Sequence, residues 1–158
     1  MQEPELEEAM TTVIHHSADY DGIFCREIAR KFLPDATLIG WDFSDQPLRY
    51  PAGHQVYVLD LPLDKPFALK PEIFKDGLNV IWIDHHKSAI ESHPKDIPGY
   101  RIDGVAACRL AWQWFSHLCQ SNPTHCHPAL PIKKDFLDRT VSEPLAVRLA
   151  GDQGALIA

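Results

Sequence analysis

Three short apolar runs in this chain end in side chains that can bind a metal ion or transfer a proton. Residues 13–22 read VIHHSADYDG, residues 56–61 read VYVLDL, and residues 80–86 read VIWIDHH. A single aspartate at a strand end is usually a turn or cap residue. Carboxylates brought together from three strand ends repel one another unless a cation neutralises them, so together they predict a metal site. The candidates are His15, Asp19, Asp21, Asp60, Asp84, His85 and His86.

The donor set favours one kind of metal and one kind of reaction. Oxygen and imidazole ligands without a thiolate suit Mn²⁺ or Mg²⁺ better than structural zinc. Asp19-Tyr20-Asp21 is a D-x-D pair on a loop, which can present each carboxylate to a different ion. Two ions about 3.5–4 Å apart activate a water and neutralise phosphoryl oxygens during in-line attack. The sequence has no GxSxG, P-loop or GxGxxG motif that would indicate a rival chemistry.

The elements that must position these residues alternate along the chain. Short β-branched and apolar runs predict strands, and apolar residues at helical spacing predict helices. This alternation predicts a mainly parallel β-sheet flanked by helices, a Rossmann-like three-layer α/β fold. In such sheets ligands bind at the carboxyl ends of the strands, where the candidates lie. The expected strands span residues 11–16, 36–41, 55–61 and 79–84, and the expected helices span 21–33, 104–119 and, broken near Pro144, 135–152.

Length and composition limit the classes of protein that fit. A chain of 158 residues with 45% hydrophobic and 23% charged residues is typical of one globular domain. We expect residues 1–10 to form a flexible extension and residues 11–158 to form the domain. The net charge of −7 disfavours a protein that binds long duplex nucleic acid. The sequence shows no signal peptide and no apolar run of membrane-spanning length, so we expect a cytoplasmic protein without membrane contact.

The four cysteines do not suggest a disulfide framework or a standard zinc site. Cys25 and Cys108 lie on apolar helical faces, which favours reduced core residues over a chemical role. Residues 118–128 read LCQSNPTHCHP, which is an alternative zinc-binding segment. Its spacing matches no standard zinc site, and its prolines indicate a loop.

In order and spacing, HHSADYDG, VLDL and IDHH resemble the first three motifs of the DHH phosphoesterase superfamily. That superfamily includes RecJ-type exonucleases, oligoribonucleases of the nanoRNase group, cyclic-dinucleotide phosphodiesterases and family II inorganic pyrophosphatases. The resemblance extends from Val13 to Asp152, nearly the whole chain. It implies a DHH domain with two Mn²⁺ ions per site, with Mg²⁺ as a substitute.

The resemblance also implies a role for each candidate. His15 and Asp19 would bind the first ion, Asp60 would bridge both, and the second ion would be bound by Asp21, His85 and Asp152, the last at the position of the fourth motif. Asp84 would orient a ligand. His86 would contact the substrate phosphate or donate a proton to the leaving group, and Lys87 would steer a phosphate. For Lys87, an exposed helix start is the competing interpretation. For His16, a packed or solvated neighbour is favoured over a ligand.

One departure from the family pattern leaves more than one functional hypothesis open. Family members of known activity carry a second, C-terminal substrate-binding lobe, for which we find no counterpart. The chain is then part of a longer protein, a minimal phosphoesterase with an open site and low turnover, or a domain that has lost catalysis.

We favour a Mn²⁺-dependent phosphoesterase acting on a small phosphodiester, such as a short oligonucleotide or dinucleotide. The first alternative is a catalytically weak or inactive lobe that serves as a metal-binding protein-interaction module, for which a homodimer is one arrangement. The second is a pyrophosphatase or phosphomonoesterase. We disfavour pyrophosphate as the substrate, because its charge needs cationic groups that the missing lobe normally supplies.

Overall fold

A computed structural model of the protein describes residues 10–75, 78–121, 137 and 141–157, and for residues 72, 75, 118–121 and 152–157 it describes the backbone alone. The five strands of this part of the chain form one parallel sheet. They are β1 (Thr11–His16), β2 (Thr37–Trp41), β3 (Gln55–Leu59), β4 (Val80–Asp84) and β5 (Gly99–Arg101). The predicted α/β fold with a parallel sheet is therefore confirmed.

The strand order is β2-β1-β3-β4-β5, the doubly wound order in which chain connections leave β1 and β3 in opposite directions. The register aligns the carboxyl ends of the strands: His16 pairs with Trp41, Leu59 with Ile83, and Asp84 with Arg101. Sheets of this order bind ligands at the carboxyl edge, beside the point where the winding reverses. That point lies between β1 and β3.

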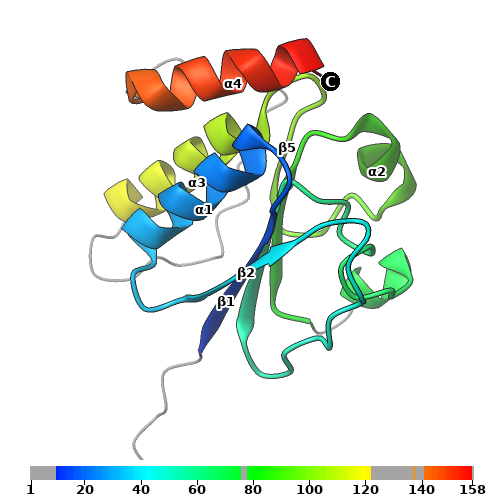
Figure 1. Ribbon diagram of the computed structural model, residues 1–158. Coiled ribbons are helices and arrows are strands. Elements are labelled where there is room, and N and C mark those ends of the chain that lie inside the picture. The colour runs from blue at the N-terminus through cyan, green and yellow to red at the C-terminus, as the bar shows by residue number, and fades with distance from the viewer. Residues whose placement is uncertain (1–9, 76–77, 122–136, 138–140, 158) are drawn as a thin grey trace, which may run out of the picture.

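Helices cover both faces of the sheet (Figure 1). Helices α1 (Tyr20–Phe32), α3 (Ala107–Ser121) and α4 (Leu145–Ile157) pack together on one face, and α2 (Lys87–Ser92) and the 3-10 helix η1 (Pro71–Lys75) lie on the other. Alternate residues of each strand enter two separate cores. In β4, Ile81 and Ile83 face α1 and α3, while Val80 and Trp82 face the α2 side. Because both faces are buried, the central strands β3 and β4 are mostly apolar instead of alternating.

Most expected elements are present, with bounds shifted by a few residues. The structure adds β5 and η1, which the sequence did not predict, and the short helix α2, of which the sequence suggested only a start at Lys87. Cys25 and Cys108 are buried and free, as expected. Among the described residues, no helix is long and apolar enough to cross a membrane. The expected extension over residues 1–10 lies, except for Met10, outside the described part of the chain, as do residues 122–128 of the alternative zinc segment.

Candidate metal centre

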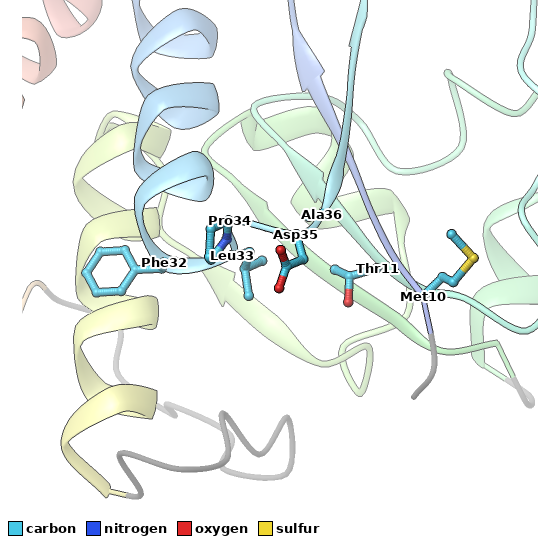
Figure 2. A pocket seen from close by; sticks show the side chains of 7 residues that line it. All are labelled: Met10, Thr11, Phe32, Leu33, Pro34, Asp35 and Ala36. Carbon is cyan, nitrogen blue, oxygen red and sulfur yellow. The ribbon is translucent and has the colours of Figure 1, made fainter. Parts of the chain in front are cut away.

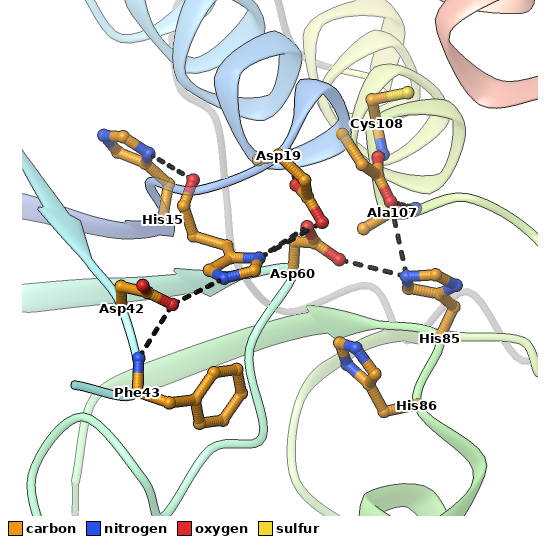
Figure 3. A network of polar contacts seen from close by, with 12 residues as sticks. His15, Asp19, Asp42, Phe43, Asp60, His85, His86, Ala107 and Cys108 are labelled. Carbon is orange, nitrogen blue, oxygen red and sulfur yellow. Dashed lines mark hydrogen bonds and ion pairs between the residues drawn. The ribbon is translucent and has the colours of Figure 1, made fainter. Parts of the chain in front are cut away.

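Eight acidic and histidine side chains meet at the carboxyl edge of the sheet, and we call them the strand-end cluster; Figure 3 shows most of it. They come from β1, the start of α1, and the ends of β2, β3 and β4, so the D-x-D pair expected on a loop is the N-cap and first turn of a helix. The cluster therefore occupies the position where a doubly wound sheet binds its ligand. Its members are His16, Asp19, Asp21, Asp42, Asp60, Asp84, His85 and His86.

Asp60 stands at the centre of the cluster, directly after β3. Its backbone has a φ of +61°, which is uncommon for a residue other than glycine. Its amide donates to the Ile83 carbonyl at 2.9 Å, which fixes the turn against β4. Oδ1 accepts a hydrogen bond from His85 Nε2 at 3.0 Å, whereas the buried Oδ2 has no hydrogen-bond partner among the described residues. Such an unsatisfied buried carboxylate oxygen fits a cation ligand.

His16 connects Asp60 to two further carboxylates. Its Nδ1 lies 3.2 Å from Asp19 Oδ2 and 3.6 Å from Asp60 Oδ2, and its Nε2 lies 3.1 Å from Asp42 Oδ1. The contacts with Asp19 and Asp60 raise the pKa of His16 to about 10, against the opposing effect of burial. An imidazole surrounded by three carboxylates holds a proton that a metal ion would displace.

The neighbouring His15 does not join the cluster. It faces the opposite side of the sheet, where its Nδ1 donates to the His16 carbonyl at 3.0 Å and burial lowers its pKa (Figure 3). Its ring lies over Gly40 of β2, where an added Cβ would come within 3.3 Å of it. Adjacent residues of a strand point to opposite faces, so only one of the two histidines can face Asp60. The geometry gives His16 the place that the resemblance gave to His15.

Asp19 and Asp21 serve different elements. Asp19 caps α1 by accepting a hydrogen bond from the Gly22 amide at 2.8 Å. Burial alone would raise its pKa, but the contacts with His16 and the Gly22 amide lower it to about 2. Asp21 is buried and accepts hydrogen bonds from the Ala107 and Cys108 amides at 3.0 and 2.7 Å, which anchors the start of α3. Its Oδ2 also lies 3.3 Å from His85 Nε2. Burial and then the charge of Asp60 raise the Asp21 pKa to about 6.

Gly22 allows α1 to begin against the end of β1. A Cβ added at this position would lie 2.0 Å from the His16 carbonyl oxygen, a distance that no side chain tolerates. The DYDG sequence therefore does two things: its aspartates supply carboxylates, and its glycine lets the helix approach the strand closely enough to present them.

Asp84 and His86 form a pair on the β4 side of the cluster. Asp84 is fully buried, and its Oδ1 lies 2.6 Å from Nδ1 of His86. This hydrogen bond raises the pKa of His86. It also fixes the ring, so that Nε2 is the nitrogen that can face a ligand. His85 points toward Asp60 and Asp21; burial would lower its pKa, but the bond with Asp60 raises it to about 9.

Two overlapping groups of ligand atoms in the cluster could hold ions. In one, ligand atoms of Asp60, Asp84, His85 and His86 lie within 4.8 Å of one another; in the other, those of His16, Asp19 and Asp60 do. Asp60 belongs to both groups, which is the arrangement that a carboxylate bridging two ions requires. Oxygen and imidazole donors without sulfur match the hard divalent cations predicted from the sequence.

Two other predicted residues are not among the side chains of the cluster that the structure describes. Lys87 is exposed at the first position of α2, 3.9 Å from Glu91, which agrees with the interpretation as a helix start. Asp152 belongs to α4, but its side chain lies outside what the structure describes. Asp42 is a cluster residue that sequence reasoning missed. It follows β2 directly, so the strand-end rule applied to the sequence LIGWD would have found it.

A separate pocket of about 370 Å³ lies at the other end of β1, lined by Met10, Thr11 and residues 32–36 (Figure 2). It is at the amino ends of the strands, away from the edge where such sheets bind ligands. Its lining has a single ionisable side chain, Asp35, and therefore offers no comparable chemistry.

The fold and the site together define an α/β protein with a carboxylate–histidine cluster at the switch point of its sheet. No protein-family model matches the chain, and no curated protein matches it. A crystal structure of an uncharacterized protein from Helicobacter pylori G27 is similar, with a TM-score of 0.53 and 16% sequence identity. The match covers 74% of this chain and 39% of that one, so this chain spans well under half of the neighbour's length. At this identity the likeness concerns the fold alone.

Proposed function

We propose that the protein is a Mn²⁺-dependent phosphoesterase that hydrolyses a small phosphodiester at the strand-end cluster. The observation that carries this proposal is the pair of ligand groups that share Asp60. Two divalent ions bound there would lower the pKa of a water and neutralise the phosphoryl oxygens.

The charge balance of the cluster supports a cation site. Five carboxylates converge, and the histidines among them have raised pKa values, so that protons neutralise part of the negative charge. A divalent cation would replace those protons and satisfy the buried Oδ2 of Asp60, which has no hydrogen-bond partner among the described residues. Clustered acids and imidazoles that exchange protons for metal are typical of catalytic metal sites.

The chain's own residues divide the work. Asp19, Asp60, His16 and His85 would hold the ions, and the Asp21 carboxylate would support His85 while it anchors α3. His86 would donate a proton to the leaving oxygen, because Asp84 keeps its ring oriented and its pKa raised. His86 is also the most exposed of the histidines in the cluster and is accessible to a substrate.

The test is the manganese content of the purified protein, measured by elemental analysis after loading and dialysis. We expect two ions per chain, and Mn²⁺-dependent hydrolysis of bis-p-nitrophenyl phosphate. Asp60→Asn keeps the shape and tolerates the positive φ, but it removes the shared charge. We expect it to weaken metal binding by at least about 100-fold and to abolish hydrolysis.

Asp35→Asn is the matched control, because it makes the same chemical change at an exposed position at the opposite edge of the sheet. It should leave metal content and hydrolysis unchanged. One ion or none in the wild-type protein, or full hydrolysis in Asp60→Asn, would refute the proposal.

A further inference from the structure

An exposed aromatic ring borders the strand-end cluster on its β2 side. Phe43 follows Asp42, and 52% of its surface is open to solvent. Its ring centroid lies 5.6 Å from that of His16, at an interplanar angle of 72° (Figure 3). A single exposed apolar side chain is common on protein surfaces, so it is the contact with a metal-ligand candidate that sets Phe43 apart.

The segment that carries Phe43 is held in place. The Phe43 amide donates to Asp42 Oδ1 at 2.9 Å, the Asp42 amide donates to Asp45 Oδ2 at 2.9 Å, and the Asp45 amide donates to the Asp42 carbonyl at 2.8 Å. The same Asp42 Oδ1 lies 3.1 Å from His16 Nε2. One carboxylate oxygen therefore fixes both the turn below the ring and the imidazole beside it. A ring that is already positioned loses little conformational entropy when a ligand stacks on it.

The aromatic neighbours of Phe43 leave room for parallel stacking. The rings of His16 and Trp41 meet it at 72° and 67°, both edge contacts. By contrast, Phe32 in the core is stacked on Phe115 at 12°. Trp41 is buried and donates its indole N–H to the Gln46 carbonyl at 3.0 Å, so it supports Phe43 from inside the protein. Phe43 thus has firm support on one side and solvent on the other.

We propose that Phe43 is a stacking platform for the base of a nucleotide whose phosphate binds in the strand-end cluster. The inference rests on the proposed function and names its substrate class. His16 touches Phe43 on one side and Asp60 on the other, so the platform and the phosphate position are one imidazole apart. In a nucleotide, base and phosphate are separated only by the sugar. Base stacking on aromatic rings tolerates every base, so the platform would bind nucleotides without strong sequence preference.

The platform also discriminates between the two phosphate chemistries that the sequence left open. Pyrophosphate has no ring to stack and gains nothing from an exposed phenylalanine. A nucleotide ester gains the stacking contact in addition to the metal contact. The residue therefore favours nucleotide diesters over pyrophosphate.

Calorimetry with the manganese-loaded protein can test this with adenosine 5′-monophosphate and ribose 5-phosphate, which differ only in the base. We expect the nucleotide to bind about tenfold more tightly. Phe43→Leu keeps the apolar contact with Trp41 but removes the aromatic face. It should erase the difference and leave the affinity for ribose 5-phosphate unchanged, whereas Phe43→Trp should keep the difference. Tyr20→Leu is the matched control, because Tyr20 is another exposed aromatic, 64% open, near the same edge.

Each other outcome is decisive. Equal affinity of the two phosphates for the wild-type protein would overturn the platform and leave the phosphoesterase proposal standing. A base preference that survives in Phe43→Leu, or that is lost in Tyr20→Leu instead, would also overturn it. Failure of both phosphates to bind would overturn the proposed function and the platform with it.

Discussion

The two histidine pairs of this protein, His15–His16 and His85–His86, look alike in the sequence but are used differently. The first pair lies inside β1, where successive side chains face opposite sides, so His16 enters the cluster and His15 packs over Gly40. The second pair follows the last residue of β4, where that alternation no longer applies. Its rings lie 4.8 Å apart, both beside carboxylates of the cluster.

The difference shows how the end of a strand sets the number of ligands that a motif can deliver. A pair within a strand delivers one side chain to each face. A pair after a strand can deliver both to one site, provided that a fixed partner holds each ring. Asp60 and Asp84 are those partners for His85 and His86, and Asp60 also contacts His16.

The largest effect is expected for Gly22→Ala, which should disturb the packing of α1 against β1. The added Cβ would collide with the His16 carbonyl, so α1 would have to move away from β1 and take Asp19 and Asp21 with it. We expect a loss of roughly 3 kcal/mol or more in the free energy of unfolding, measured by urea denaturation.

Gly53→Ala is the control for this glycine substitution. Unlike Gly22, Gly53 has a positive φ of 80°, but nothing lies within 4 Å of an added Cβ, so only backbone strain of about 1 kcal/mol is expected. Equal destabilisation by the two variants would show that the contact between α1 and β1 is not what Gly22 provides.

The next largest effects are expected when the two histidines of the first pair are replaced one at a time. His16→Ala should weaken Mn²⁺ binding by about 100-fold, because it removes the imidazole between Asp19 and Asp60. His15→Ala should cost about 2 kcal/mol of stability, because it empties a buried position, but leave metal binding intact. The rise in melting temperature on adding Mn²⁺ separates the two variants. Metal binding lost in His15→Ala and kept in His16→Ala would support the assignment that the resemblance implies.

The different positions of His15 and His16 mark the limit of what the sequence could predict. The strands β1, β3 and β4 and their polar ends were predictable, because apolar runs followed by acids give a clear signal. The sequence could not show which histidine of the first pair faces the cluster, because β1 is buried on both faces. Val13 and Ile14 are both core residues, so no alternation of apolar and polar residues shows which side chains face which side.

Other parts of the fold gave too little signal for their length. β5 has three residues and α2 has six, and neither is long enough to show a period. Asp21 shows a different limit. Its D-x-D spacing predicted a metal ligand, but its two hydrogen bonds to the start of α3 join residues 86 and 87 positions apart, and local sequence carries no signal of such a contact.

A smaller effect is expected within the second pair. Asp84→Asn should lower kcat by about 10–100-fold with little change in KM, because His86 loses the carboxylate that orients it. Asp84 raises the pKa of His86, so a proton donor there stays active to higher pH. The alkaline limb of the pH–rate profile should move to lower pH in Asp84→Asn and disappear in His86→Gln. An unmoved limb in Asp84→Asn would contradict the role of the pair.

The last prediction concerns the pH dependence of stability, in which His16 and His85 should behave alike. Their pKa values in the folded protein, about 10 and about 9, exceed the ordinary value of 6.5. A raised pKa contributes stability that is complete below pH 6.5 and is lost as pH rises through 9 and 10. The melting temperature of the protein in EDTA should therefore fall between about pH 7 and 10. Manganese needs the neutral imidazoles, so the stabilisation that it adds should grow between about pH 6 and 8.5. Calorimetric melting with EDTA and with Mn²⁺ across this range measures both trends. A manganese effect that shrinks with rising pH would show that protons and metal do not compete for these two rings.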